Sequence, residues 1–198
     1  MTTALPYDEV YEELIHDDGY WKWNPGKRPE VHADTLEALR LARARTVLDA
    51  GCGRGDLSRR LAVHGMEVTA SDVADCSSYI ESANVNLAHP IIFEKCSLPN
   101  IPKGPFDMVV CVDVLEHLHK KDALRSITNF FREAQYAYMR IACFPSHRGR
   151  HKTLHLTIES PFWWMDRVKE IADIHHFTVH QKGSRKDRDT ACILARRK

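Results

Sequence analysis

Residues 49–56 combine acidic side chains with the backbone freedom that a ligand-binding loop needs. The segment reads DAGCGRGD, with a glycine at every second position from Gly51 to Gly55. Because glycine has no Cβ, such a loop can turn sharply and lets a ligand approach the main chain. The preceding run RTVLDAG is apolar and predicts a strand, and the following GDLSRRLAVHG predicts a helix. We therefore expect a small molecule to bind where this strand ends.

Two carboxylates indicate which ligand the loop prefers. Spaced glycines also occur in the G-x-G-x-x-G fingerprint of dinucleotide-binding loops. In that fingerprint the third glycine would stand at Asp56, where a carboxylate would repel a pyrophosphate at the start of the helix. Asp49, at the end of the strand, instead suits a cation such as the amino group of a methionine moiety. S-adenosylmethionine (SAM) carries that group and no phosphate, so we expect SAM rather than NAD.

A third aspartate follows the next predicted strand. MEVTASD reads as a strand, and Asp72 stands 17 residues after Gly55. A carboxylate at this place can accept hydrogen bonds from both hydroxyls of a ribose. The alternative is a turn residue in the polar segment SDVADCSS. We expect Asp72 to bind the ribose of the cofactor.

Strands and helices alternate through the rest of the chain. FDMVVCVDV is the strongest predicted strand, residues 114–133 predict a helix, and AYMRIACF predicts a further strand. Near-continuous apolar strands separated by helices indicate a parallel sheet covered on both faces. HFTVHQK and TACILARR are joined by too short a turn for a helical crossover, so they should pair antiparallel. The sequence thus predicts one α/β domain with a doubly wound, mostly parallel seven-stranded sheet that ends in an antiparallel hairpin.

These segments resemble the class I SAM-dependent methyltransferases, and most closely their small type 11/12 branch, which modifies small molecules, sugars and lipids. VLDAGCGRGDLSRRLA, VTASDVA and FDMVVCVDVLEHL carry the resemblance, which covers residues 45–143 well. It implies a Rossmann-like enzyme with a catalytic core over 45–198 and N-terminal helices with an aromatic lid over 1–43. The residues that it implies around the cofactor are Asp49, Gly51, Cys52, Gly53, Asp72, Val73, Cys96, Ser97 and Val112.

The end of the fourth predicted strand offers an acid–base pair. A helix beginning near Val114 would place Asp113 and His117 on one side of its first turn. Methyl transfer from a sulfonium is an in-line displacement that needs a well-placed acceptor and a route for its proton. Asp113 would then orient His117 as the base. The alternative is that Glu116 and His117 only cap and pack the helix.

The same segment raises the question of a metal ion. The resemblance includes ubiquinone-pathway and small-RNA 2′-O-methyltransferases, which bind a divalent ion through E-x-x-E-H, and this chain has D-x-x-E-H. Asp113, Glu116 and His117 would be the ligands, with His155 or Glu159 as the fourth. We nevertheless expect no metal, and turnover that survives EDTA.

Two further segments are expected to contact the acceptor. In FPSHRGRHKTLHLTIESPFWW, the alternation TLHLTI turns His155 away from its leucine neighbours. The resemblance to relatives with a histidine in this loop and a tryptophan pair soon after implies that His155 faces the acceptor, and Arg148 and Arg150 would attract an anionic group. In GYWKW, Tyr20 and Trp21 would form a lid over cofactor and acceptor. The alternatives are an exposed loop histidine and aromatic side chains that pack the N-terminal helices.

Composition sets the remaining bounds. The chain has 198 residues, 43% of them hydrophobic and 28% charged, as in one globular domain. No apolar run approaches the roughly 18 residues of a membrane span, no secretion signal is visible, and the six scattered cysteines include no CxxC pair. We expect a reduced, cytoplasmic protein. The net charge is +1, yet residues 144–198 carry 12 Lys and Arg against 6 Asp and Glu.

The sequence therefore predicts methyl transfer from SAM to a hydroxyl, or an amine, of a small molecule or carbohydrate such as a nucleotide sugar. A nucleic-acid methyltransferase is the first alternative. Two observations argue against a nucleic-acid methyltransferase. The net charge of the chain is near zero, and the segment CVDVLEHL stands where a base-methylation motif of the N-P-P-Y type would be expected. A noncatalytic SAM-binding subunit is the second alternative.

Overall fold

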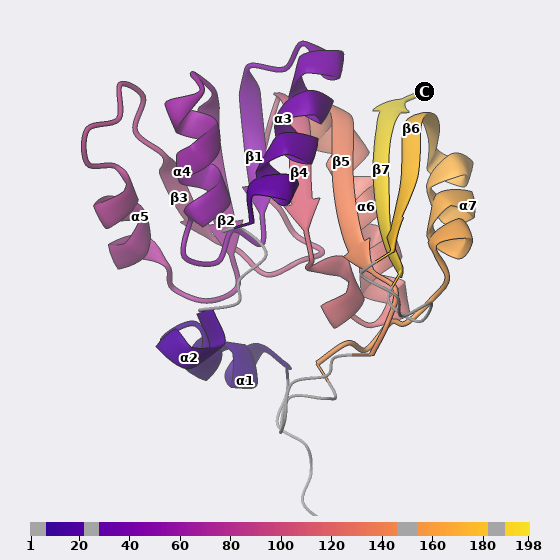
Figure 1. Cartoon of the computed structure of the whole chain (residues 1–198), viewed down its shortest axis with the longest axis horizontal. Coiled ribbons are helices and arrows are strands. Elements are labelled where there is room, and N and C mark those ends of the chain that lie inside the picture. Colours follow the sequence, from indigo (N-terminus) through magenta and orange to yellow (C-terminus); the bar gives the residue numbers. More distant parts are fainter. Residues whose placement is uncertain (1–6, 22–27, 146–153, 182–188) are drawn as a thin grey trace, which may run out of the picture.

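A seven-stranded sheet forms the centre of the molecule (Figure 1). The structure is a computed structural model that describes residues 7–21, 28–145, 154–181 and 189–198. In spatial order the strands are β3, β2, β1, β4, β5, β7 and β6, and β7 runs in the opposite direction to the other six. The strands are β1 (Thr46–Ala50), β2 (Glu67–Asp72), β3 (Ile92–Lys95), β4 (Phe106–Val112), β5 (Ala134–Ala142), β6 (Ala172–Gln181) and β7 (Asp189–Arg197). The predicted sheet and its closing hairpin are confirmed.

Helices cover both faces of the sheet because the central strands are apolar on both sides. Leu48, Val109 and Met139 belong to the core under α6 and α7, whereas Val47, Val68 and Val110 belong to the core under the other helices. The helices are α3 (Pro29–Ala42), α4 (Asp56–Val63) and α5 (Ser77–Ala83) on one face, and α6 (Lys120–Glu133) and α7 (Pro161–Ile171) on the other (Figure 1). No helix in the described part of the chain is long and apolar enough to span a membrane.

The order of the strands places a switch point between β1 and β4. From β1 the chain proceeds outward to β2 and β3, then returns to the other side of β1 at β4. Two short N-terminal helices, α1 (Tyr7–Leu14) and α2 (Asp18–Trp21), lie outside the two helix layers, beyond the end of the sheet (Figure 1). In open α/β sheets a ligand binds beyond the carboxyl ends of the strands at such a point.

The predicted helix over 114–133 is wrong at its beginning. Only a short 3₁₀ helix, η2 (Leu115–His117), follows β4, and α6 begins after His119, whose backbone is extended. The carbonyl of Glu116 accepts from the backbone N–H groups of Leu156 and Thr157. Because a distant segment uses this carbonyl, it cannot serve a continuous α-helix.

Candidate functional site

The glycine loop after β1 is folded so tightly that a Cβ would meet neighbouring atoms at each of its three glycines. Gly51 and Gly53 both have positive φ, at 81° and 55°. A Cβ on Gly51 would lie 2.4 Å from a methyl group of Val114, and one on Gly53 would lie 2.3 Å from the ring of Trp21. The backbone N–H groups of Gly51 and Cys52 donate to the carbonyl of Ser71 at the end of β2. The loop is thus held against the ends of two parallel strands.

Asp49 is a buried carboxylate next to this loop. It is 2% exposed, and the hydroxyl of Ser58 in α4 donates to it at 2.5 Å. Desolvation raises the pKa of Asp49 to about 6, although the bond from Ser58 opposes the shift. A buried carboxylate with one neutral partner favours a cationic ligand, because a positive charge would offset the cost of burial.

Asp72 is buried in the same way at the end of β2. Its carboxylate accepts from the backbone N–H groups of Gly53, at 2.8 Å, and Ala74, at 3.0 Å. Desolvation raises its pKa to about 6 despite these bonds. The carboxylate therefore holds the glycine loop and retains acceptor capacity for hydroxyl groups of a ligand.

The other residues expected at the cofactor follow neighbouring strand ends. Val73 comes directly after Asp72, and the backbone N–H of Cys96 donates to the carbonyl of Asp72 at 2.8 Å. Ser97 is the next residue, and Val112 ends β4. Cys52 is buried in the glycine loop with its thiol beside the carbonyl of Gly53. All six cysteines are free. These residues therefore lie at the ends of neighbouring strands, as the predicted cofactor site requires, and their roles in binding the cofactor remain predictions.

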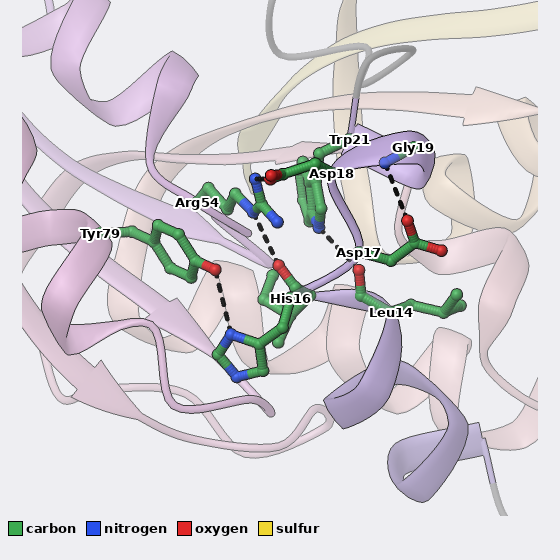
Figure 2. A network of polar contacts seen from close by, with 9 residues as sticks. Leu14, His16, Asp17, Asp18, Gly19, Trp21, Arg54 and Tyr79 are labelled. Atoms are coloured by element: carbon green, nitrogen blue, oxygen red, sulfur yellow. Dashed lines mark hydrogen bonds and ion pairs between the residues drawn. The ribbon is translucent and has the colours of Figure 1, made fainter.

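Trp21 covers the glycine loop and belongs to a small network of polar and aromatic side chains (Figure 2). Its indole N–H donates to the carbonyl of Leu14 at 3.0 Å. Arg54, inside the glycine loop, donates to the carbonyl of Ile15 at 2.7 Å and to Asp18 at 2.6 Å. The guanidinium also lies over the rings of Trp21 and Tyr79. Arg54 therefore fastens the N-terminal helices to the loop, and a lid over cofactor and acceptor remains a prediction.

Removing this fastening should loosen the lid. We expect Arg54→Ala to raise the Kd for S-adenosylhomocysteine about tenfold and to speed amide hydrogen exchange over residues 11–21. The physical reason is that the variant loses the charged hydrogen bond to Asp18 and two cation–π contacts. Calorimetry and exchange mass spectrometry measure both effects. Arg60→Ala, at an exposed position of α4, is the control, and equal behaviour of the two variants would contradict the assignment.

Asp113 does not orient His117, so this expectation is wrong. Asp113 has a φ of 54° and lies outside any helix. Its carboxylate forms a short ion pair with Arg140 of β5, and both side chains are largely buried. Nδ1 of His117 instead faces the carbonyl of Leu154 at 2.9 Å. The cause is the 3₁₀ turn, which replaces the α-helix on which the predicted pairing depended.

His155 takes the place beside His117 that was predicted for Asp113. The two rings meet edge to face at 4.8 Å, and Nδ1 of His155 lies 2.5 Å from the carbonyl of Phe144. A ring nitrogen that faces a carbonyl carries the proton, so each Nε2 carries a lone pair. Burial and the neighbouring His155 lower the pKa of His117 to about 3. The imidazole of His117 is therefore neutral at pH 7, with the lone pair of Nε2 available to a ligand.

Glu116 completes this cluster. Its Oε1 accepts from the backbone N–H of Ala142 at 3.1 Å, whereas Oε2 is buried without a hydrogen-bond partner in the described structure. Burial raises the pKa of Glu116 well above its usual range. One ligand atom each from Glu116, His117 and His155 lie within 4.8 Å of one another. Of the other donors considered for an ion, Asp113 is paired with Arg140 and Glu159 with Lys120.

Some predicted residues lie outside the described part of the chain, and three contributors were missed. The side chain of Tyr20 and the whole of Arg148 and Arg150 are not described. Ser58, Arg54 and Arg140 were not predicted. The sequence held a signal for Arg54, which is the charged residue inside the glycine loop. It held none for Arg140, whose role depends on the register of β4 and β5.

Comparison with known proteins places this geometry among methyltransferases. A family model described as a methyltransferase domain matches residues 47–134. YqeM of Bacillus subtilis, a provisionally named methyltransferase, is 31% identical over 130 residues, which are 64% of this chain and 49% of that protein. The SAM-dependent Diels-Alderase iliD of a Neonectria species is 34% identical over 142 residues, 67% of this chain and 52% of that protein. The chain spans about half the length of these curated relatives.

A solved structure extends the likeness to almost the whole chain. The N-methyltransferase NodS of Bradyrhizobium japonicum, in complex with S-adenosylhomocysteine, superposes with a TM-score of 0.76 at 18% identity. The match covers 96% of this chain and 98% of NodS. At this identity the likeness is one of fold. The relatives' names include both methyl transfer and a cycloaddition, so they leave the acceptor open.

Proposed function

Because the chain belongs to the class I SAM-dependent methyltransferases, we propose that it binds SAM and transfers the methyl group to a small acceptor. The observation that carries this proposal is the pair of buried carboxylates, Asp49 and Asp72, on either side of a glycine loop. Asp49 would hold the amino group of the methionine moiety and Asp72 the ribose. Neither carboxylate suits a pyrophosphate, because like charges repel in a desolvated site.

The cofactor can be tested before any acceptor is known. We expect calorimetry to show micromolar binding of SAM and S-adenosylhomocysteine and no binding of NAD. Asp72→Ala should weaken SAM by about 1–3 kcal/mol, the range for hydrogen bonds that involve a charge. Asp75→Ala, three residues on and exposed, is the matched control. Binding of NAD without SAM would overturn the proposal.

The acceptor that we propose is a hydroxyl, or an amine, of a small molecule or carbohydrate. Support comes from the partly buried acceptor wall of His117 and His155, which two backbone carbonyls hold in fixed orientations. Holding an acceptor in line supplies most of the rate, since effective molarities reach about 10⁵–10⁸ M. The excess of basic residues after Phe144 favours an anionic acceptor such as a nucleotide sugar.

The buried Oε2 of Glu116 favours a second candidate, in which a divalent ion takes part at the acceptor wall. A family resemblance implies such an ion, and the residues fit it, because Oε2 lacks a hydrogen-bond partner and the imidazoles of His117 and His155 lie beside it. Glu116, His117 and His155 would hold the ion. When bound, it would polarise the acceptor hydroxyl and lower its pKa. A metal-free site remains the expectation from sequence alone.

A chelator separates the two candidates. We now expect EDTA to lower turnover at least tenfold and Mg²⁺ or Mn²⁺ to restore it, because an imidazole with a pKa near 3 is a weak base at pH 7. Glu116→Gln should abolish Mn²⁺ binding, measured by electron paramagnetic resonance, and leave SAM affinity unchanged. Full turnover in EDTA would instead support proton transfer to His117 without an ion.

A further inference from the structure

A second group of metal-binding side chains lies away from the glycine loop and the acceptor wall. It consists of Asp34 from α3, His180 from β6 and Cys192 from β7. One ligand atom from each lie within 4.8 Å of one another. Oδ2 of Asp34 is 3.5 Å from Nε2 of His180, and the hydroxyl of Thr178 lies at the same distance from that nitrogen. Three separate elements therefore direct a carboxylate, an imidazole and a thiol to one point.

The chemistry of these three groups matches zinc. Zinc bonds to sulfur, nitrogen and oxygen at about 2.0–2.3 Å in a tetrahedral arrangement, which separates neighbouring ligand atoms by about 3.3–3.7 Å. The distance between Asp34 and His180 already falls in this range. Cys192 is 3% exposed, whereas His180 is exposed and offers the ion a way in. Small rotations of the two outer side chains would complete the geometry.

A buried hydroxyl lies beside the group. Tyr138 of β5 is 4% exposed, and burial, the charge of Cys192 and a hydrogen bond with the Cys192 thiol raise its pKa. When the thiol proton is lost to a metal, the Tyr138 hydroxyl can donate to the sulfur and hold this ligand in place.

Without a metal, the surroundings of Cys192 favour the protonated thiol. Burial raises its pKa, although a hydrogen bond with Tyr138 and the nearby guanidinium of Arg140 act in the opposite direction. The charge of Arg140 is itself neutralised by Asp113. A metal would displace the thiol proton and replace it as the partner of sulfur.

We propose that Asp34, His180 and Cys192 form a zinc site that clips helix α3 to the β6–β7 hairpin. Binding forms a Zn–S bond and releases the proton of Cys192 to solvent. Affinity should therefore rise with pH. The site is independent of the cofactor, and its proposal does not rest on the proposed methyl transfer.

Cobalt titration of the metal-free protein tests the site, because a thiolate ligand gives a near-ultraviolet charge-transfer band. The ligands proposed at the acceptor wall, Glu116, His117 and His155, contain no sulfur, so cobalt held by them gives no such band. We expect the band in the unmodified protein, its loss in Cys192→Ser, and at least tenfold weaker binding in His180→Ala. Zinc should displace the cobalt and raise the Tm of the unmodified protein but not of His180→Ala.

The controls keep the result decisive even if Cys192→Ser folds poorly. His180 is exposed, so His180→Ala should fold, and His176→Ala changes a neighbouring exposed histidine of the same strand outside the group. Absence of the band in the unmodified protein would overturn the proposal. The same holds if the band survives unchanged in both His180→Ala and Asp34→Asn.

Discussion

Replacing His117 by alanine is expected to lower kcat at least 100-fold and to leave SAM affinity nearly unchanged. His117 lies after the end of β4 and contacts Leu154 and His155. Loss of a group that acts on the acceptor proton typically costs about 10²–10⁴-fold. Loss of an ion ligand at the same place should cost as much. The measurement is turnover with an acceptor found by screening nucleotide sugars and phenols, beside calorimetry with SAM.

His155→Ala decides how His117 acts. If His117 takes the proton without an ion, His155 mainly positions the acceptor, and its loss should raise the acceptor KM and spare kcat. If an ion is held, both variants should lose kcat, and excess Mn²⁺ should restore His155→Ala in part. His119→Ala is the control, because His119 is exposed at the start of α6 and its side chain makes no capping bond. If both His117→Ala and His155→Ala keep a near-normal kcat, neither histidine acts on the acceptor proton, and the rate comes from positioning of the acceptor alone.

The arrangement of the glycine loop and its two aspartates could be predicted from sequence, because each of these residues lies at or directly after the end of a strand. The glycine loop and Asp49 are contiguous, and Asp72 directly ends the next strand. In a parallel sheet, consecutive strands end at the same edge, so residues that follow strands come together without any knowledge of tertiary packing. The family resemblance, and not this reasoning, supplied Cys96 and Ser97.

The acceptor side could not be predicted because its contacts join distant segments. Asp113 pairs with Arg140, 27 residues away, and His117 faces the carbonyl of Leu154, 37 residues away. The pattern over 114–133 is helical, yet the carbonyl of Glu116 is used by the segment that returns from β5. The spacing of apolar residues along the sequence does not show that a distant segment will hydrogen-bond to this carbonyl and so interrupt the helix. Arg54 escaped prediction for the same reason, since its partners Ile15 and Asp18 lie 39 and 36 residues away.

Asp49→Asn is expected to make the ligand-free protein more stable and to weaken SAM binding about 100-fold. The carboxyl of Asp49 is buried, and its pKa is raised from 3.8 to about 6. A raised carboxyl pKa favours folding at low pH, and this contribution is lost as pH rises from about 4 through 6. At pH 7.5 the charged form therefore destabilises the ligand-free fold by about 1–3 kcal/mol. Asparagine removes that cost and can still accept from Ser58.

The same substitution removes the charge that would hold the amino group of SAM. Truncating one partner of a buried charge pair costs about 2–5 kcal/mol of binding. Thermal unfolding between pH 4 and 8 should show the variant more stable than the unmodified protein above pH 6, with the difference vanishing near pH 4. SAM affinity of the unmodified protein should fall more steeply as pH drops below 6 than that of the variant, in which Asp72 alone of the two carboxylates still titrates. Asp166→Asn, exposed on α7, controls for the change of net charge. A variant that is less stable at pH 7.5, or binds SAM normally, would show that Asp49 serves the fold and not the cofactor.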